Sequence, residues 1–124
     1  MTAPGGEVTL QTIAMPADSN ANGDIFGGWL MAQMDLGASV MARKRARGRV
    51  ATVAVDAMQF LKPVKIGDVV SIHSEMAREG RSSMHIGVEV WITRQPSGEQ
   101  TKVTEAVFTF VAIDDHGKPR ALPV

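Results

Sequence analysis

One long helical pattern, free of basic residues until its last turns, most constrains how this chain can fold. The pattern runs from about residue 25 or 27 to residue 47, and it is apolar around most of its girth before Arg43. The residues that recur at helical spacing are Leu30, Met34, Gly37 or Ala38, and Met41. At about 1.5 Å per residue, such a helix spans roughly 30 Å. Because it lacks a broad polar face, we predict that a sheet wraps around it.

The rest of the chain has the pattern of strands. Residues 7–14 alternate as a short strand does, and a loop of turn-forming residues follows at 15–23. After Gly48, four β-rich segments are separated by turns; they are 49–61, 69–78, 82–93 and 101–113. Since short turns join consecutive strands, we predict antiparallel pairing between them. Several strands are apolar on both faces, so we expect the helix to cover one face and a second copy of the protein to cover the other.

Composition bounds the size and class of the protein. The chain has 124 residues, which predicts a single domain over residues 1–124. It has 13 Lys and Arg against 13 Asp and Glu, so its formal net charge is zero. A zero charge argues against nucleic-acid binding and favours association between copies. No apolar run approaches 18 residues and the N-terminus lacks a signal peptide pattern, so we expect a cytoplasmic protein that does not enter a membrane.

Several kinds of catalytic and metal site are excluded or disfavoured. The chain has no cysteine, which excludes disulfides, thiolate zinc sites and cysteine nucleophiles. Its three histidines, His73, His85 and His116, are far apart in the sequence, which argues against a metal site. His73 and His85 could lie near each other across a hairpin, but we expect both to be surface or sheet-packing residues.

Asp35 is the candidate catalytic residue. It lies in the middle of the predicted helix with no basic residue within seven positions, so it can neither cap the helix nor form an ion pair at helical spacing. One interpretation is an exposed polar stripe shared with Gln33 or Ser39. The other is a partly buried carboxylate in an apolar site, which would suit a general base. The shortage of polar positions in this helix favours the second interpretation.

A polar loop at residues 18–24 leads into a helix that begins near Gly27 and Gly28. Glycine is a poor helix former, but free N–H groups at a helix start can bind an oxygen that carries negative charge. The alternative is a turn followed by a tight contact between helix and sheet. Gly28 and Asp35 are seven residues apart, so they face one side of the helix, roughly 10 Å apart along its axis. Oxyanion donors and a base would then share one helix.

Three basic segments are candidates for phosphate binding. Two of them, Lys62–Lys65 and Arg81–Ser83, lie at predicted turns, which are either solvated or bind phosphate. The third, Arg43–Arg49, is better explained as a helix end, where cations interact favourably with the helix dipole.

Four blocks of the sequence, in order, resemble one family. They are NANGDIFGGWLMAQMD, TVAVDAMQFLKPVKIGDVV, GRSSM and TEAVFTFVAIDD, and they resemble the YciA-type acyl-CoA thioesterases of the hotdog-fold superfamily over residues 10–123. The resemblance implies an α+β hotdog fold, a long central helix wrapped by five or six antiparallel strands. It further implies hydrolysis of acyl-CoA without a cofactor or metal. The assembly would be a homodimer with sites at its interface, and three dimers would form a hexamer.

The resemblance also assigns roles to residues. Asp35 matches the catalytic carboxylate, Asn20 matches a loop asparagine that acts from the partner subunit, and Gly28 matches the backbone donor to the thioester oxygen. Asp35 would act as general base or as nucleophile through an anhydride. The residues that resemble the substrate-binding region are Phe26, Gly27, Lys62, Arg81, Ser82 and Ser83. Of these, the last four would receive the CoA nucleotide.

Three other functions are alternatives to hydrolysis. A hydratase or dehydratase on the same fold needs a histidine paired with an acid, and residues 15–48 contain no histidine. A non-catalytic acyl-CoA-binding module would bind its ligand without releasing thiol. A purely structural oligomer would leave the cost of Asp35 in an apolar helix without explanation.

Overall fold

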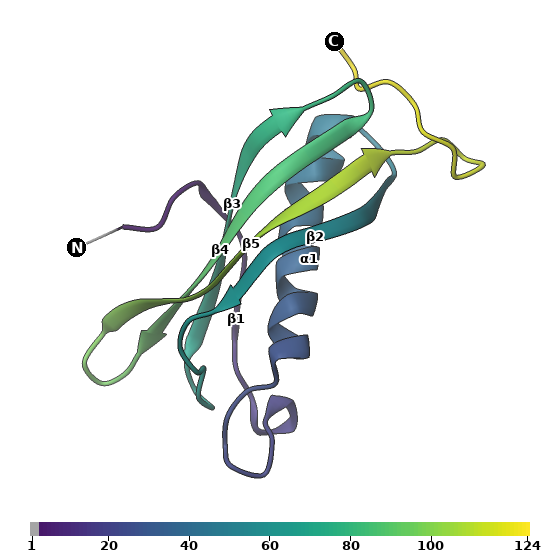
Figure 1. Cartoon of the computed structure of the whole chain (residues 1–124). Coiled ribbons are helices and arrows are strands. Elements are labelled where there is room, and N and C mark those ends of the chain that lie inside the picture. The colour runs from purple at the N-terminus through teal and green to yellow at the C-terminus, as the bar shows by residue number, and fades with distance from the viewer. Residues whose placement is uncertain (1–2) are drawn as a thin grey trace.

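A single antiparallel sheet curves around one long helix, as the apolar girth of that helix predicts (Figure 1). The fold is known from a computed structural model, which describes residues 3–124. The helix, α1, spans Gly27–Ala46, and a short 3-10 turn at Pro16–Asp18 precedes it. The strands are β1 (Glu7–Ile13), β2 (Val50–Phe60), β3 (Val69–Glu79), β4 (Ser83–Arg94) and β5 (Glu99–Ala112). The sheet therefore has five strands, and the predicted segments agree with them to within about two residues.

The core lies between α1 and the inner face of the sheet. In β4, alternate residues face the helix and are buried, as the alternation predicts; they are Met84, Ile86, Val88, Val90 and Ile92. From β5, Phe108 and Phe110 join them with their ring centroids 6.4 Å apart. Small residues of α1 let the backbone approach the sheet, and a Cβ at Gly37 would lie 2.6 Å from Cγ2 of Ile72. Gly37 is therefore a packing glycine.

The strand order corrects one sequence-based prediction. The order is β1-β3-β4-β5-β2, so the expected antiparallel pairing of the second and third strands is wrong. Strand β2 instead pairs with β5, from Val50 opposite Ala112 to Phe60 opposite Thr104. The connection after β2 is tied to the loop before α1, because the N–H of Ile25 donates to the carbonyl of Val64 (2.9 Å). This connection carries the chain from one edge of the sheet to the other side, where β3 pairs with β1.

The C-terminal residues fasten the end of α1. The Arg120 guanidinium donates to the carbonyl oxygens of Ile113 (3.0 Å) and Ala46 (2.9 Å), so the tail crosses the last turn of the helix. Arg45 donates to the carbonyl of Pro123 and forms two hydrogen bonds with the carboxylate of Glu79 in β3 (2.9 Å each). Both ends of the helix are thus bound to the sheet and its connections. Within residues 3–124, no helix combines the length and the hydropathy needed to cross a membrane.

Candidate active site

The N-terminal end of α1 presents an open backbone amide. The N–H of Gly28 belongs to the first helical turn, where amides have no intrahelical acceptor, and no backbone acceptor for it is found among residues 3–124. Gly28 is exposed, and nothing lies within 4 Å of the place that a Cβ would take. Open space and a free donor at the positive end of the helix dipole suit an incoming oxygen with negative charge.

The two glycines differ in what surrounds them. A Cβ at Gly27 would lie 3.2 Å from two ring carbons of Phe60, so Gly27 makes the tight contact that was the alternative interpretation. Phe60 ends β2 and its side chain is half exposed. Sequence reasoning missed this residue, although an aromatic residue directly before the Leu61-Lys62-Pro63 segment was a signal that could have found it.

A cleft of about 320 Å³ opens beside Gly27. Its lining is Ile25, Gly27, Leu30, Phe60, Leu61, Lys62, Pro63 and Val64. The structure thus brings together two of the residues predicted to bind substrate, Gly27 and Lys62. Phe26, which precedes Gly27, is exposed at the same end of the helix.

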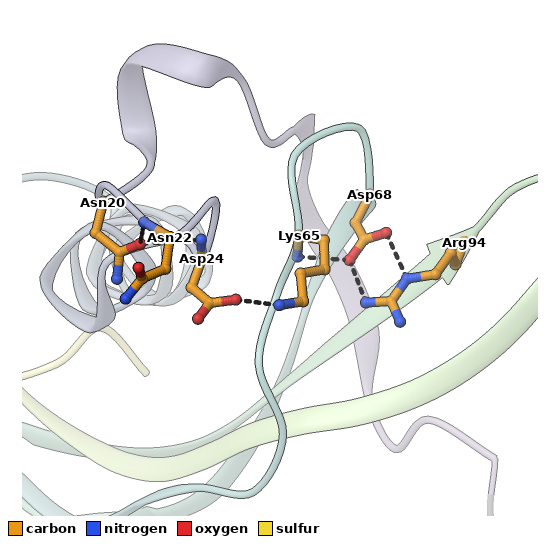
Figure 2. A network of polar contacts seen from close by, with 6 residues as sticks. All are labelled: Asn20, Asn22, Asp24, Lys65, Asp68 and Arg94. Carbon is orange, nitrogen blue, oxygen red and sulfur yellow. Dashed lines mark hydrogen bonds and ion pairs between the residues drawn. The ribbon is translucent and has the colours of Figure 1, made fainter.

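Asn20 organises the loop in front of α1 (Figure 2). Its Oδ1 accepts hydrogen bonds from the N–H groups of Asn22 (2.8 Å) and Asp24 (3.1 Å). Its own N–H donates to the carbonyl of Asp24 (2.8 Å). The Nδ2 group of Asn20 forms no hydrogen bond within the described part of the chain, so it can donate to another group.

Asp35 lies half-buried between α1 and β2. Its Oδ1 accepts a hydrogen bond from the hydroxyl of Thr52 (2.6 Å), which holds one carboxylate oxygen in place. Sequence reasoning missed Thr52, because only the position of β2 brings it next to the helix. The residues that follow this pair in the sequence are apolar and exposed, Leu36 after Asp35 on the helix and Val53 after Thr52 on the strand.

Asn20 and Asp35 lie apart within one chain. Asn20 is hydrogen-bonded within its own loop, whereas Asp35 is bonded to Thr52 more than two turns further along the helix direction. One chain therefore does not bring the two residues together, and their joint action across two chains stays a prediction.

The predicted phosphate-binding residues fall into two groups at opposite ends of the molecule. Lys62 lies at the cleft beside the start of α1. Arg81 and Ser82 lie in the turn between β3 and β4, and Ser83 begins β4; this turn lies next to the C-terminal end of α1 (Figure 1). There the carbonyl of Arg81 accepts from the N–H of Leu122 (2.8 Å). Because α1 is 20 residues long, one chain holds the two groups roughly 30 Å apart.

The histidines of the sheet pack within it. His73 is opposite Glu89, and His85 is opposite Arg78, so the two are not neighbours across the hairpin. His85 bonds to Thr109 through Nδ1 (3.1 Å) and to Arg78 through Nε2 (3.3 Å). Burial lowers the pKa of His73, and the nearby negative charge of Glu89 opposes this effect. In the part of the chain that the structure describes, no three His, Cys, Asp or Glu side chains are placed to hold a metal ion.

Comparison with known proteins identifies close relatives of this chain. A family model described as the thioesterase superfamily matches residues 22–98. The acyl-CoA thioester hydrolase YciA of Escherichia coli (strain K12) is 53% identical over 124 residues, which cover 98% of this chain and 94% of that protein.

Two solved structures share the fold. The hexameric thioesterase of Yersinia pestis superimposes with a TM-score of 0.94 at 57% identity, covering 98% of this chain and 99% of that one. The hexameric hotdog fold thioesterase of Campylobacter jejuni superimposes with a TM-score of 0.90 at 37% identity, covering 95% and 91% of the two chains. These likenesses confirm the predicted hotdog fold.

Proposed function

This chain belongs to the thioesterase superfamily, and on that basis we propose that it hydrolyses acyl-CoA to a carboxylic acid and free CoA. The observation that carries the proposal is the 53% identity with an acyl-CoA thioester hydrolase over 98% of the chain. The chemistry of the residues at the helix supports it, because a free backbone donor and a carboxylate share α1.

We infer that the thioester oxygen accepts a hydrogen bond from the N–H of Gly28. The positive end of the helix dipole and this donor would stabilise the negative charge that develops on the oxygen. Donors that are fixed before the reaction lower its barrier because they need no reorganisation.

Asp35 would then activate the attack. Thr52 holds one carboxylate oxygen, which leaves the other to accept a proton from a water molecule as that water adds to the carbonyl carbon. The tetrahedral intermediate expels the CoA thiolate, which takes the proton back from Asp35. In the alternative route, Asp35 attacks the carbonyl directly and expels the CoA thiolate, which leaves a mixed anhydride. Water then hydrolyses this anhydride to the carboxylic acid and returns the Asp35 carboxylate, and the proton released passes to the thiolate. The partner's Asn20 would orient the water or the carbonyl through its Nδ2 group, and neither route requires a cofactor.

We also propose that the active protein is a trimer of dimers, as the hexameric relatives support. The exposed apolar side chains around Asp35 would then be covered by a second chain. In such an assembly, Lys62 of one chain and Arg81–Ser83 of another could contact the same CoA nucleotide, which a single chain cannot achieve.

The test is the release of free thiol from acetyl- to palmitoyl-CoA, followed with a thiol-reactive dye. We expect the wild-type protein to release thiol and Asp35→Ala to lower kcat by about 10²–10⁴-fold, the usual contribution of general acid–base catalysis. The matched control is Asp115→Asn, which removes an exposed carboxylate from the C-terminal tail and should leave kcat unchanged.

Two outcomes would count against the proposal. Near-normal turnover by Asp35→Ala would show that Asp35 is not the catalytic carboxylate. If the folded wild-type protein bound acyl-CoA and released no thiol, the non-catalytic binding module would be the better explanation.

A further inference from the structure

Two ion pairs lie near the loop of residues 18–24, which we call the Asn20 loop (Figure 2). One hydrogen bond, from a backbone N–H to a carboxylate, connects the two pairs. The first joins the Lys65 ammonium to the carboxylate of Asp24. The second joins Arg94 to Asp68 through two hydrogen bonds (3.0 and 2.8 Å). Between them, the N–H of Lys65 donates to Oδ2 of Asp68 (2.9 Å).

The Asp68 pair is the fixed end of this chain of contacts. The Asp68 side chain is only 3% exposed, and Arg94 belongs to β4 in the sheet. Burial alone would raise the pKa of Asp68, but the hydrogen bonds from Arg94 and from the N–H of Lys65 outweigh it and the pKa is lowered. Asp68 is therefore held as a carboxylate, and it binds the Lys65–Asp68 turn to the sheet.

Asp24 is the other end of this chain of contacts, and two hydrogen bonds join it to Asn20. The carbonyl of Asp24 accepts from the N–H of Asn20 (2.8 Å), and the N–H of Asp24 donates to Oδ1 of Asn20 (3.1 Å). Asp24 also pairs with Lys65 in an isolated antiparallel bridge. The orientation of the Asn20 side-chain amide is therefore tied to the position of the Asp24 backbone.

The ion pair between Asp24 and Lys65 is too exposed to serve mainly for stability. The two side chains are 36% and 48% exposed, and ion pairs of this kind contribute little to global stability. The pair does fix the loop against the turn that Asp68 anchors. We propose that Lys65 is a positioning residue, which holds the Asn20 loop in its active orientation through the carboxylate of Asp24. This inference rests on the proposed function.

The test compares kcat and KM for thiol release in Lys65→Met, which keeps the aliphatic stem and removes the charge. A misplaced Asn20 weakens a contact made during the reaction, so we expect kcat to fall about tenfold while KM changes less than twofold. Lys65→Arg should restore most of the activity, because it returns a cation within reach of Asp24. Lys118→Met, which removes an exposed lysine from the C-terminal tail, is the matched control.

A double-mutant cycle separates positioning from a general loss of structure. If Lys65 acts through Asp24, then Asp24→Asn lowers kcat by a similar factor, and the double variant is no slower than either single variant. The proposal would be overturned if the kcat losses of the two single variants multiplied in the double variant, or if kcat were unchanged in Lys65→Met. A raised KM with unchanged kcat would also overturn it, by showing that Lys65 binds the CoA phosphates directly.

Thiol release by the wild type and by Lys65→Met separates the positioning role from the proposed function. A wild-type protein that releases no thiol contradicts the hydrolase itself. An active wild type whose Lys65→Met variant matches it contradicts only the positioning role.

Discussion

At the scale of single residues, His73 shows how burial in the sheet affects stability. Its side chain is 9% exposed, and burial lowers its pKa in the folded state. In the unfolded chain the same group has the ordinary pKa of about 6.5. Between these two pKa values the unfolded state binds more protons, so acid favours unfolding.

We therefore expect the free energy of unfolding to fall as the pH is lowered below about 6.5, the ordinary pKa of histidine. His73→Gln should reduce this slope, because it removes the group that takes up the proton. Urea unfolding at several pH values and one protein concentration measures the effect. The exposed His116→Gln serves as control, and equal slopes in both variants would show that His73 does not cause the dependence.

Residue patterns also predicted part of the candidate site. Asp35 was identifiable because nothing near it in the sequence could pair with it. Thr52 was not, because its hydroxyl reaches Asp35 only through the pairing of β2 with β5. The contacts of Lys65 were hidden for the same reason, since Asp24 lies 41 positions away in the sequence.

At the scale of elements, periodicity predicted the helix and strands, and the short turns correctly predicted that β3 pairs with β4 and β4 with β5, but not the neighbour of β2. Alternation reveals which face of a strand is buried, and β4 follows it closely. It carries no information about the strand on either side. The position of β2 at the edge of the sheet depends on contacts between residues far apart in the sequence. One example is the hydrogen bond from the N–H of Ile25 to the carbonyl of Val64, which no local pattern contains.

The end of α1 depends on a residue that is far away in the sequence. The carbonyl of Ala46 belongs to the last helical turn, where carbonyls lack intrahelical partners, and Arg120 donates to it (2.9 Å). We expect Arg120→Met to lower the free energy of unfolding by about 1–3 kcal/mol, because it removes both hydrogen bonds that the guanidinium donates, to Ala46 and to Ile113. Chemical denaturation measures the change.

Arg43→Met is the control for this prediction, since the Arg43 side chain forms no hydrogen bond with the residues that the structure describes. An equal loss in both variants would indicate a general effect of charge at the helix end and not a contact of Arg120.

At the scale of the whole molecule, the helix and the edge strand that pack together both carry apolar side chains that a single chain leaves exposed. They are Met31, Leu36 and Val40 on α1, and Val53 and Val55 on β2. Strand β2 is also an edge strand, with its outer backbone groups free to pair. Both features favour contact with a second chain at the side where Asp35 lies.

We expect Val53→Asp to break the assembly into smaller species and to abolish thiol release, because each proposed site needs two chains. Light scattering coupled to size-exclusion chromatography measures the mass. Val8→Asp, on the edge strand β1, changes a similarly exposed valine and should leave the assembly intact. If Val8→Asp dissociated the protein while Val53→Asp did not, the chains would associate through β1 instead.

The strand order also has a consequence for the order of events during synthesis. Strands β3, β4 and β5 are consecutive and form a meander, so their contacts are local, whereas β1 pairs only with β3 and β2 only with β5. Local contacts form early and distant ones late. The apolar helix therefore leaves the ribosome before β3, β4 and β5, three of the strands that contact it, have been made. During that interval the nascent chain exposes the surface that chaperones bind and that aggregation exploits.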